Sequence, residues 1–253
     1  MARRPRVDMA GYYHIINRGV EKRVIFLDAD DYEYFEELLE KYTKDFNITM
    51  HNYALMSNHY HLLIETHQTN LSKFMRQINA NYAIYFNKKY KRVGHLWQGR
   101  FKSWFVTNKA YLYTLIIYIE QNPIKANIVE RIEEYPYSSG HIFLNYDSIP
   151  KWLRKSYLAK NYKGNKDAIR EFLYTTIDQD QLKELKTSSS LMGATNTKEL
   201  DIKKLKQLLQ GFNDKTERNR LIVEAYKMGY SQHRIAKVLG VVQSTIHRII
   251  KNA

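Results

Sequence analysis

Cysteine is absent from the 253 residues of the chain. Disulfide scaffolds, thiolate zinc sites and cysteine nucleophiles are therefore excluded, and the absence fits a reducing compartment. Only 4 prolines and 10 glycines are present, too few for a collagen-like or broadly disordered chain. The longest apolar run, residues 111–119, is far shorter than the roughly 20 residues that a membrane span needs. We therefore expect a cytoplasmic protein with no membrane partner.

Acidic residues are also in the minority. The 26 Asp and Glu stand against 40 Lys and Arg, which leaves a net charge of +14. Such an excess favours a polyanionic partner, either nucleic acid or an acidic membrane surface. The chain also has 21 tyrosines, and a basic surface rich in tyrosine suits base stacking beside phosphate contacts.

The pattern of apolar residues predicts the order β-α-β-β-α-β followed by one more helix. Asp28 or Asp30 can cap the first helix and Asn108 the third, which Pro123 should end at Asn122. The predicted strands are 11–17, 48–56, 59–66 and 101–107, and the predicted helices are 29–46, 71–89 and 109–122. This order indicates an α+β domain with a ferredoxin-like antiparallel sheet and helices on one face.

The second half of the chain is organised differently. Residues 140–186 are expected to form a helical extension of unassigned role, helical over 157–177, and 187–200 form a small-polar linker. Residues 201–253 carry 11 Lys and Arg against 4 Asp and Glu. The domain boundaries are therefore predicted at 139, 186 and 200.

The basic C-terminal module has the spacing of a helix-turn-helix. Helices are predicted over 219–228 and 232–239, with Gly240 in the turn and a third helix from Val241. Val242 stands where such motifs usually place a capping Ser or Thr. A packing module that binds no DNA is the alternative interpretation. The recognition-helix candidates for duplex DNA are Gln243, Ser244, Thr245, His247 and Arg248.

Two histidines alternate along the third predicted strand. His59 and His61 lie two residues apart, so their side chains share one face with Leu63 and Glu65. Two imidazoles placed in this way can grip one divalent cation, and an oxygen as third ligand shifts the preference toward Mg²⁺ or Mn²⁺. His-x-His also arises by chance, so the pair needs a third ligand to count as a site.

The third predicted helix places Tyr118 and Asn122 on one face, because four residues separate them. A tyrosine hydroxyl can attack a phosphodiester and form a covalent phosphotyrosine. A cation that polarises the phosphate would compensate for the high pKa of the phenol. Asn122 offers a carbonyl oxygen to such a cation. An ordinary core stripe of Tyr111, Leu115 and Tyr118 is the alternative.

Taken together, these residues resemble the HUH single-strand transposases with one tyrosine, in particular the REP-associated tyrosine transposase branch of the IS200-like family. The resemblance runs in unbroken order from about Gly11 to Ser139. It is carried by residues 13–19, 53–64, 85–87, 94–103 and 118–127, and it ends at 137–139.

The resemblance implies the chemistry of residues 1–139. His59, His61 and Asn122 would hold the cation, Mg²⁺ or Mn²⁺, and Tyr118 would be the nucleophile. Single-stranded DNA beside a hairpin would be cut and rejoined through a 5′-phosphotyrosine, by a monomer or homodimer associated with the nucleoid. For His14, a packed strand histidine is favoured over a partner of the ligands. The implied DNA contacts are Arg3, Arg4, Arg6, Arg18, His95, Gln98 and Arg100.

Three other functions remain open from the sequence. A transposase-derived regulator could bind DNA hairpins without cutting them. A replication or conjugation initiator shares the chemistry, but the chain has no phosphate-binding Gly-x-x-x-x-Gly-Lys loop. RNA binding through the sheet would leave the His, Tyr and Asn set unexplained.

Overall fold

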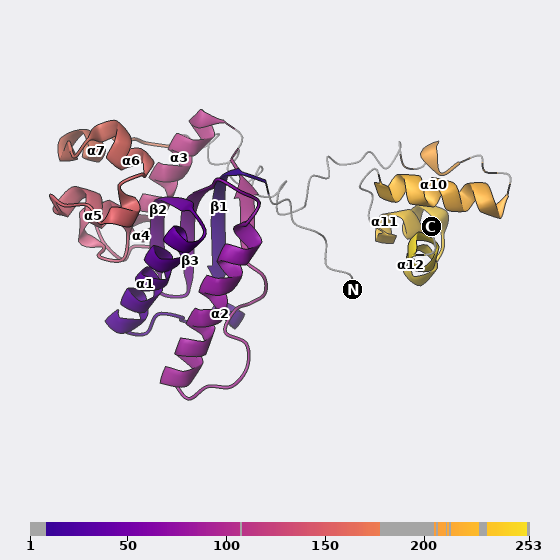
Figure 1. The fold of residues 1–253 in the computed structure, drawn as a ribbon, viewed down its shortest axis with the longest axis horizontal. Helices are drawn as coiled ribbons and strands as arrows, with labels where there is room; N and C mark the ends of the chain where they lie inside the picture. Colours follow the sequence, from indigo (N-terminus) through magenta and orange to yellow (C-terminus); the bar gives the residue numbers. More distant parts are fainter. Residues whose placement is uncertain are drawn as a thin grey trace. The chain divides into compact units, whose positions relative to one another are not determined.

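A computed structural model describes residues 9–106, 108–177, 205, 207–210, 212, 214–227 and 232–251. The chain divides into two compact units, 1–193 and 194–253 (Figure 1). The proposed linker 187–200 and the basic residues Arg3, Arg4 and Arg6 lie outside the described residues. No helix in the described part of the chain combines the length and apolar character that crossing a membrane would require.

The first unit is built on one antiparallel sheet with the strand order β2-β3-β1-β4. Its strands are β1 (Gly11–Arg18), β2 (Ile48–Met56), β3 (His59–Thr66) and β4 (Lys102–Phe105). Strands β2 and β3 match the predicted bounds, and Ser57 and Asn58 form the turn between them. Strand β4 is shorter than predicted. The register shift between Met50 and Asn52 marks a bulge in β2, which the alternation did not reveal.

Two helices cover one face of this sheet, as the ferredoxin-like order predicts. They are α1 (Ala29–Asp45), capped by Asp28, and α2 (Leu71–Lys89). The ring of Tyr60 on β3 packs against Phe35 of α1, and the Tyr53 hydroxyl on β2 donates to Glu36. The contacts between these helices and the sheet form one part of the core of the unit.

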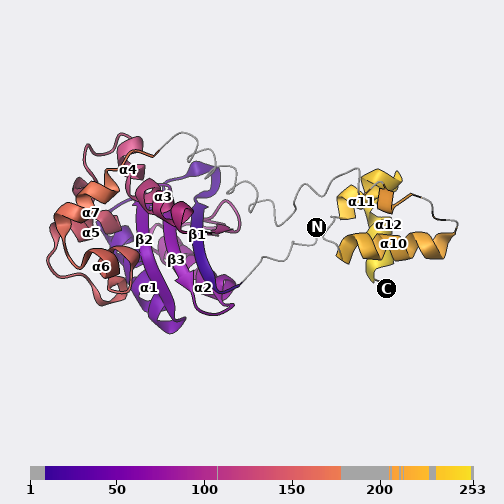
Figure 2. The same ribbon diagram turned by 90° about the horizontal axis from the view of Figure 1, so that it is seen from above.

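Helix α3 (Lys109–Glu120) lies against the opposite face, and Figure 2 separates it from α1 and α2. Asn108 caps α3 by accepting from the Tyr111 N–H, as expected. The predicted end at Asn122 is wrong. The helix ends at Glu120, and Pro123 lies in the first turn of a further helix, α4 (Asn122–Lys125). Proline is tolerated there because a first-turn N–H has no partner inside the helix.

The extension beyond residue 139 packs on the same core as the sheet. It contains α5 (Ser139–Asn145), a one-turn 3₁₀ helix at Lys151–Leu153, α6 (Tyr157–Tyr162) and α7 (Lys166–Leu173). Two other one-turn 3₁₀ helices, Val20–Lys22 and Ile132–Glu134, precede the extension. The helix predicted over 157–177 is broken between Tyr162 and Lys166. Lys163 and Gly164 both have positive φ there, 47° and 82°, which ends a right-handed helix. The extension contributes six buried apolar residues to the core, namely Phe143, Leu144, Leu153, Leu158, Ile169 and Leu173.

The second unit contains α10 (Lys215–Lys227), α11 (Gln232–Leu239) and α12 (Gln243–Lys251) around a small apolar core. Gly240 has φ of 66° in the turn between α11 and α12. Val242 is exposed and precedes α12, so its apolar side chain offers no cap. Of the predicted recognition residues, His247 and Arg248 are exposed and Thr245 is half-buried, while the side chains of Gln243 and Ser244 are outside the description.

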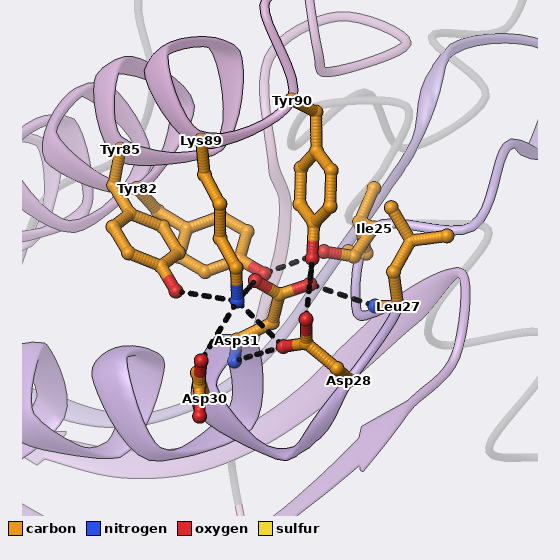
Figure 3. A network of polar contacts seen from close by, with 9 residues as sticks. All are labelled: Ile25, Leu27, Asp28, Asp30, Asp31, Tyr82, Tyr85, Lys89 and Tyr90. Atoms are coloured by element: carbon orange, nitrogen blue, oxygen red, sulfur yellow. Dashed lines mark hydrogen bonds and ion pairs between the residues drawn. The ribbon is translucent and has the colours of Figure 1, made fainter.

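A polar network ties the start of α1 to the end of α2 (Figure 3). The Asp31 carboxylate is fully buried and accepts hydrogen bonds from the Leu27 N–H at 2.7 Å and the Tyr90 hydroxyl at 2.8 Å. Lys89 Nζ lies 3.1 Å from Asp31 and 2.6 Å from Asp28. Because Asp31 is the buried member of the network, its carboxylate depends most on these hydrogen bonds and on Lys89 for stabilisation.

Replacing Asp31 by asparagine is expected to lower the free energy of unfolding by about 2–4 kcal/mol, because buried donors lose a charged acceptor. Asp30→Asn is the matched control. Its carboxylate contacts the same Lys89 Nζ at 3.3 Å, but its side chain is 76% exposed. It should cost under about 0.5 kcal/mol. Urea unfolding measures both, and equal midpoints for the two variants would contradict the prediction.

Candidate nuclease site

His59 and His61 project from β3 on the face that α3 covers. The strand register pairs His61 with Ile16 and His59 with Arg18. Their rings lie 5.1 Å apart between centroids. The ring of Tyr118 on α3 lies 5.9 Å from that of His61. The alternation along β3 therefore places both imidazoles on one face, as predicted from the sequence.

Each of the two histidines is held through the same ring nitrogen. His59 Nδ1 lies 2.6 Å from Asn58 Oδ1, and His61 Nδ1 lies 3.0 Å from His14 Nε2. An Nδ1–H that donates to an acceptor fixes the tautomer in which Nε2 keeps its lone pair. Neither Nε2 has a hydrogen-bond partner among the described residues. With Nδ1–H as the donor in both contacts, each imidazole offers Nε2 as a ligand.

The histidines of this site are neutral at neutral pH. Burial lowers the pKa of His14 to about 3. Burial, with the neighbouring His14 and His59, holds the pKa of His61 well below its ordinary value. The pKa of His59 is lowered by burial and then by the Arg18 charge. Neutral imidazoles are the form that binds a metal.

Tyr118 lies over the two central histidines. Its ring is 6.3 Å from that of His14 and meets both His14 and His61 edge to face. Burial raises the pKa of its phenol. Lys125 of α4 places Nζ 5.1 Å from the centre of the same ring. The predicted nucleophile is therefore close to the predicted ligands.

The side chain of Asn122, at the start of α4, is turned toward the end of α3. Its Nδ2 donates to the Tyr118 carbonyl at 2.8 Å and to the Ile119 carbonyl at 3.4 Å. These bonds leave Oδ1 available as an acceptor or ligand. Among the described residues, no hydrogen bond joins Asn122 to His59 or His61. Within the described ranges, no three His, Asp or Glu gather closely enough to hold an ion, so a site here would need the Asn122 oxygen.

A buried carboxylate fixes α3 against the sheet. Glu120 Oε1 accepts from Asn52 Nδ2 of β2 at 2.6 Å and from the Ser139 hydroxyl. Its Oε2 accepts from the Gly140 N–H at 2.8 Å. A side chain at Gly140 would meet Oε2 at 2.6 Å, so the approach requires glycine. Burial raises the pKa of Glu120 to about 7 against the lowering effect of these donors.

The loop 94–100 adds polar groups beside His59. The bridge between Gly19 and Trp97 docks the loop on the end of β1, and the Trp97 indole donates to the Asn79 carbonyl of α2. The Arg18 guanidinium donates to Gln98 Oε1, and the Gln98 N–H donates to the Arg18 carbonyl. Arg18, Gln98, His95 and Arg100 are all exposed. The structure therefore joins Arg18 and Gln98 next to His59.

Three residues of this arrangement were not assigned a role from the sequence. His14 is buried in β1 and contacts the predicted ligand His61, which is the less favoured of the two alternatives and depends on β1 and β3 being neighbours. Glu120 acquires its donors from residues 19 to 68 positions away. Lys125 reaches Tyr118 through the turn into α4. The segment 118–127 indicates the region through the family resemblance but predicts none of these contacts.

Residues 9–122 match the model of the family described as "Transposase IS200 like". No curated protein was found similar to the chain. The solved structure of a REP-associated tyrosine transposase bound to a REP hairpin aligns with TM-score 0.50 and 19% identity, over 59% of this chain and 89% of that chain. A protein of Deinococcus radiodurans R1 assigned to the transposases aligns with TM-score 0.34 and 16% identity, over 53% and 98%. The first of these shares the fold of the sheet and its helices.

Proposed function

Because residues 9–122 belong to the IS200-like transposase family, we propose that this protein is a metal-dependent endonuclease and strand transferase for single-stranded DNA beside hairpins. The observation that carries the proposal is the edge-to-face contact between the rings of Tyr118 and His61. It places a phenol beside two imidazoles whose Nε2 atoms face no protein partner in the described chain. A nucleophile next to a cation-binding pair is the minimum that phosphotyrosine chemistry requires.

The reaction follows from the position of Tyr118. The phenol oxygen attacks the scissile phosphorus, an O–P bond to Tyr118 forms, and the bond from phosphorus to the 3′ oxygen breaks. The phenol proton is lost and the 3′ oxygen gains one, which leaves a 5′-phosphotyrosine and a free 3′-hydroxyl. A second 3′-hydroxyl can then attack the phosphotyrosine and rejoin the strand. The bond energy is retained, so the outcome is transfer rather than hydrolysis.

A divalent cation, Mg²⁺ or Mn²⁺, would be held by Nε2 of His59 and His61 and by Oδ1 of Asn122. When bound, it would polarise the scissile phosphate and favour the phenolate. The donor set fits such an ion, since two neutral imidazoles and one amide oxygen are available. Asn58 and His14 keep the two rings in orientation.

DNA contacts complete the proposal. Arg18, Gln98, His95 and Arg100 would bind the strand beside His59, with Arg3, Arg4 and Arg6 from the N-terminus. The structural relative is bound to a REP hairpin, which supports hairpin DNA as the substrate class here. The three-helix unit would bind duplex DNA through α12 as a helix-turn-helix, tethering a monomer or homodimer to the nucleoid.

The test uses labelled hairpins with single-stranded extensions taken from the sequence flanking the gene. Incubated with Mg²⁺ or Mn²⁺, the protein should form a covalent adduct that survives denaturing electrophoresis and is absent with chelator. Scrambled hairpins are the control for specificity. Tight binding with no adduct under any divalent cation would reject the transferase and favour the non-catalytic regulator.

His14 is expected to tune the cation site without touching the ion. His14→Phe keeps an aromatic ring beside His61 but removes the nitrogen that His61 Nδ1 contacts, so the affinity for Mn²⁺ should fall about 10–100-fold. Titration calorimetry with Mn²⁺ measures the change. His141→Phe, on α5, removes a histidine that contacts the Glu133 carbonyl and should leave the affinity unchanged. Unaltered affinity in His14→Phe would contradict the positioning role.

A further inference from the structure

Lys125 is the cation nearest the proposed nucleophile. It closes α4, one turn after Asn122, and its Nζ lies 5.1 Å from the centre of the Tyr118 ring. The side chain reaches this ring from the surface, because Lys125 is an exposed residue. It is therefore accessible to a strand that approaches Tyr118. Neither the predicted ligand set nor the predicted DNA contacts include it.

Lys125 has no acidic partner in the described chain. The lysines and arginines that form ion pairs with Asp or Glu there are Lys89, Arg131, Lys166 and Arg170. Two acids lie five residues from Lys125 along the sequence. Glu120 is turned away and accepts from Asn52, Ser139 and Gly140, and Glu130 is exposed and forms no ion pair with Lys125. Partial withdrawal from water lowers the pKa of Lys125, and no described carboxylate opposes that shift. The positive charge at this position is not neutralised by the protein.

The charges around Tyr118 point to an anion as the missing partner. Arg18 lies beside His59, and Lys125 lies beside Tyr118. The three histidines of the site are neutral, and no carboxylate of the described chain acts on the pKa of Tyr118. A lysine ammonium has three donors and can bind phosphate as a point charge.

We propose that Lys125 binds the scissile phosphate beside Tyr118 and offsets the negative charge that develops during phosphoryl transfer. This inference rests on the proposed function, since it takes Tyr118 as the attacking group. Lys125 stays protonated throughout, so the proton lost by the phenol goes to solvent or to the leaving 3′ oxygen. Its contribution is electrostatic, acting on the same phosphate that Tyr118 attacks.

Lys41 provides a matched control on the other side of the sheet. It is an exposed lysine on α1 whose Nζ lies 5.3 Å from the centre of the Tyr42 ring. Lys41→Gln and Lys125→Gln therefore remove the same charge and the same kind of contact. Only Lys125→Gln removes the charge beside Tyr118. Lys125→Arg keeps the charge.

The first measurement is the salt dependence of binding to oligothymidylate, with Tyr118→Phe in every protein so that no strand is cut. Each phosphate contact to a single strand contributes about 0.7 to the slope of log affinity against log salt. Lys125→Gln should reduce the slope by about that amount, while Lys125→Arg and Lys41→Gln should leave it unchanged. Equal slopes with and without the Lys125 charge overturn the inference.

The second measurement is the single-turnover rate of adduct formation on flanking-sequence hairpins, with Tyr118 present. Lys125→Gln should lower this rate about 10–100-fold at saturating DNA, and Lys125→Arg should recover most of it. A wild-type rate in Lys125→Gln would overturn the role in transfer. If the wild-type protein forms no adduct, the proposed function fails, whereas the salt slopes still decide whether Lys125 holds a phosphate.

Discussion

Tyr118→Phe is expected to lower the rate of covalent adduct formation by about 10³-fold or more, because the variant has no oxygen to bond to phosphorus. The ring stays in place, so its edge-to-face contacts with His14 and His61 are retained. Binding of hairpin DNA should therefore be nearly unchanged. Gel quantification of the adduct together with fluorescence anisotropy of the same hairpin separates loss of chemistry from loss of binding.

Tyr113→Phe is the control on the same helix. Tyr113 lies on α3 as well, but its ring packs against Tyr157 and Phe172 of the extension. The same loss of one hydroxyl there should leave the adduct rate within about twofold, as expected for a position away from the chemistry. An adduct that persists in Tyr118→Phe would move the nucleophile to another residue.

The second large effect is expected at His59. Replacing His59 by alanine removes one imidazole from the proposed pair, so Mn²⁺ affinity and adduct formation should each fall about 100-fold or more. His59 is less buried than His61, which is 3% exposed, so the first substitution disturbs packing less. Calorimetry with Mn²⁺ and single-turnover assays across a cation series measure the two losses.

His67→Ala provides the comparison for this substitution. His67 follows β3 directly, and its Nε2 lies 3.0 Å from Thr49 Oγ1 rather than near Tyr118. It should retain wild-type affinity for Mn²⁺. Chelator should abolish the wild-type reaction, and added Mn²⁺ should restore it. Full activity in chelator, or in His59→Ala without added cation, would show that the pair does not serve an ion.

The elements that the sequence predicted best are those with the strongest periodicity. Strands β2 and β3 and helix α2 have the expected bounds, since alternation and a helical stripe of apolar residues leave little choice of register. The residues around Pro123 were predicted less well. Proline was taken as the end of a helix, yet it also suits a first turn, and only tertiary contacts decide between the two.

The candidate site was predictable where it depends on local spacing. The two-residue spacing of His59 and His61 and the four-residue spacing of Tyr118 and Asn122 each determine a shared face. The contact between His14 and His61 required the strand order, and the position of Lys125 required the turn into α4. The residues that hold Glu120 come from β2 and α5, which no local pattern connects.

The Glu120 network also determines where the sheet domain can be cut from the rest of the chain. The family match ends at Asn122, and a cut at 139 would remove Gly140 and all of α5 beyond its first residue. Glu120 would then lose the Gly140 N–H, and its buried carboxylate would keep fewer hydrogen-bond donors. Recombination that swaps such modules between proteins must therefore carry the start of α5 along with the sheet. The segment needed to keep Glu120 paired therefore extends beyond the residues of the family match.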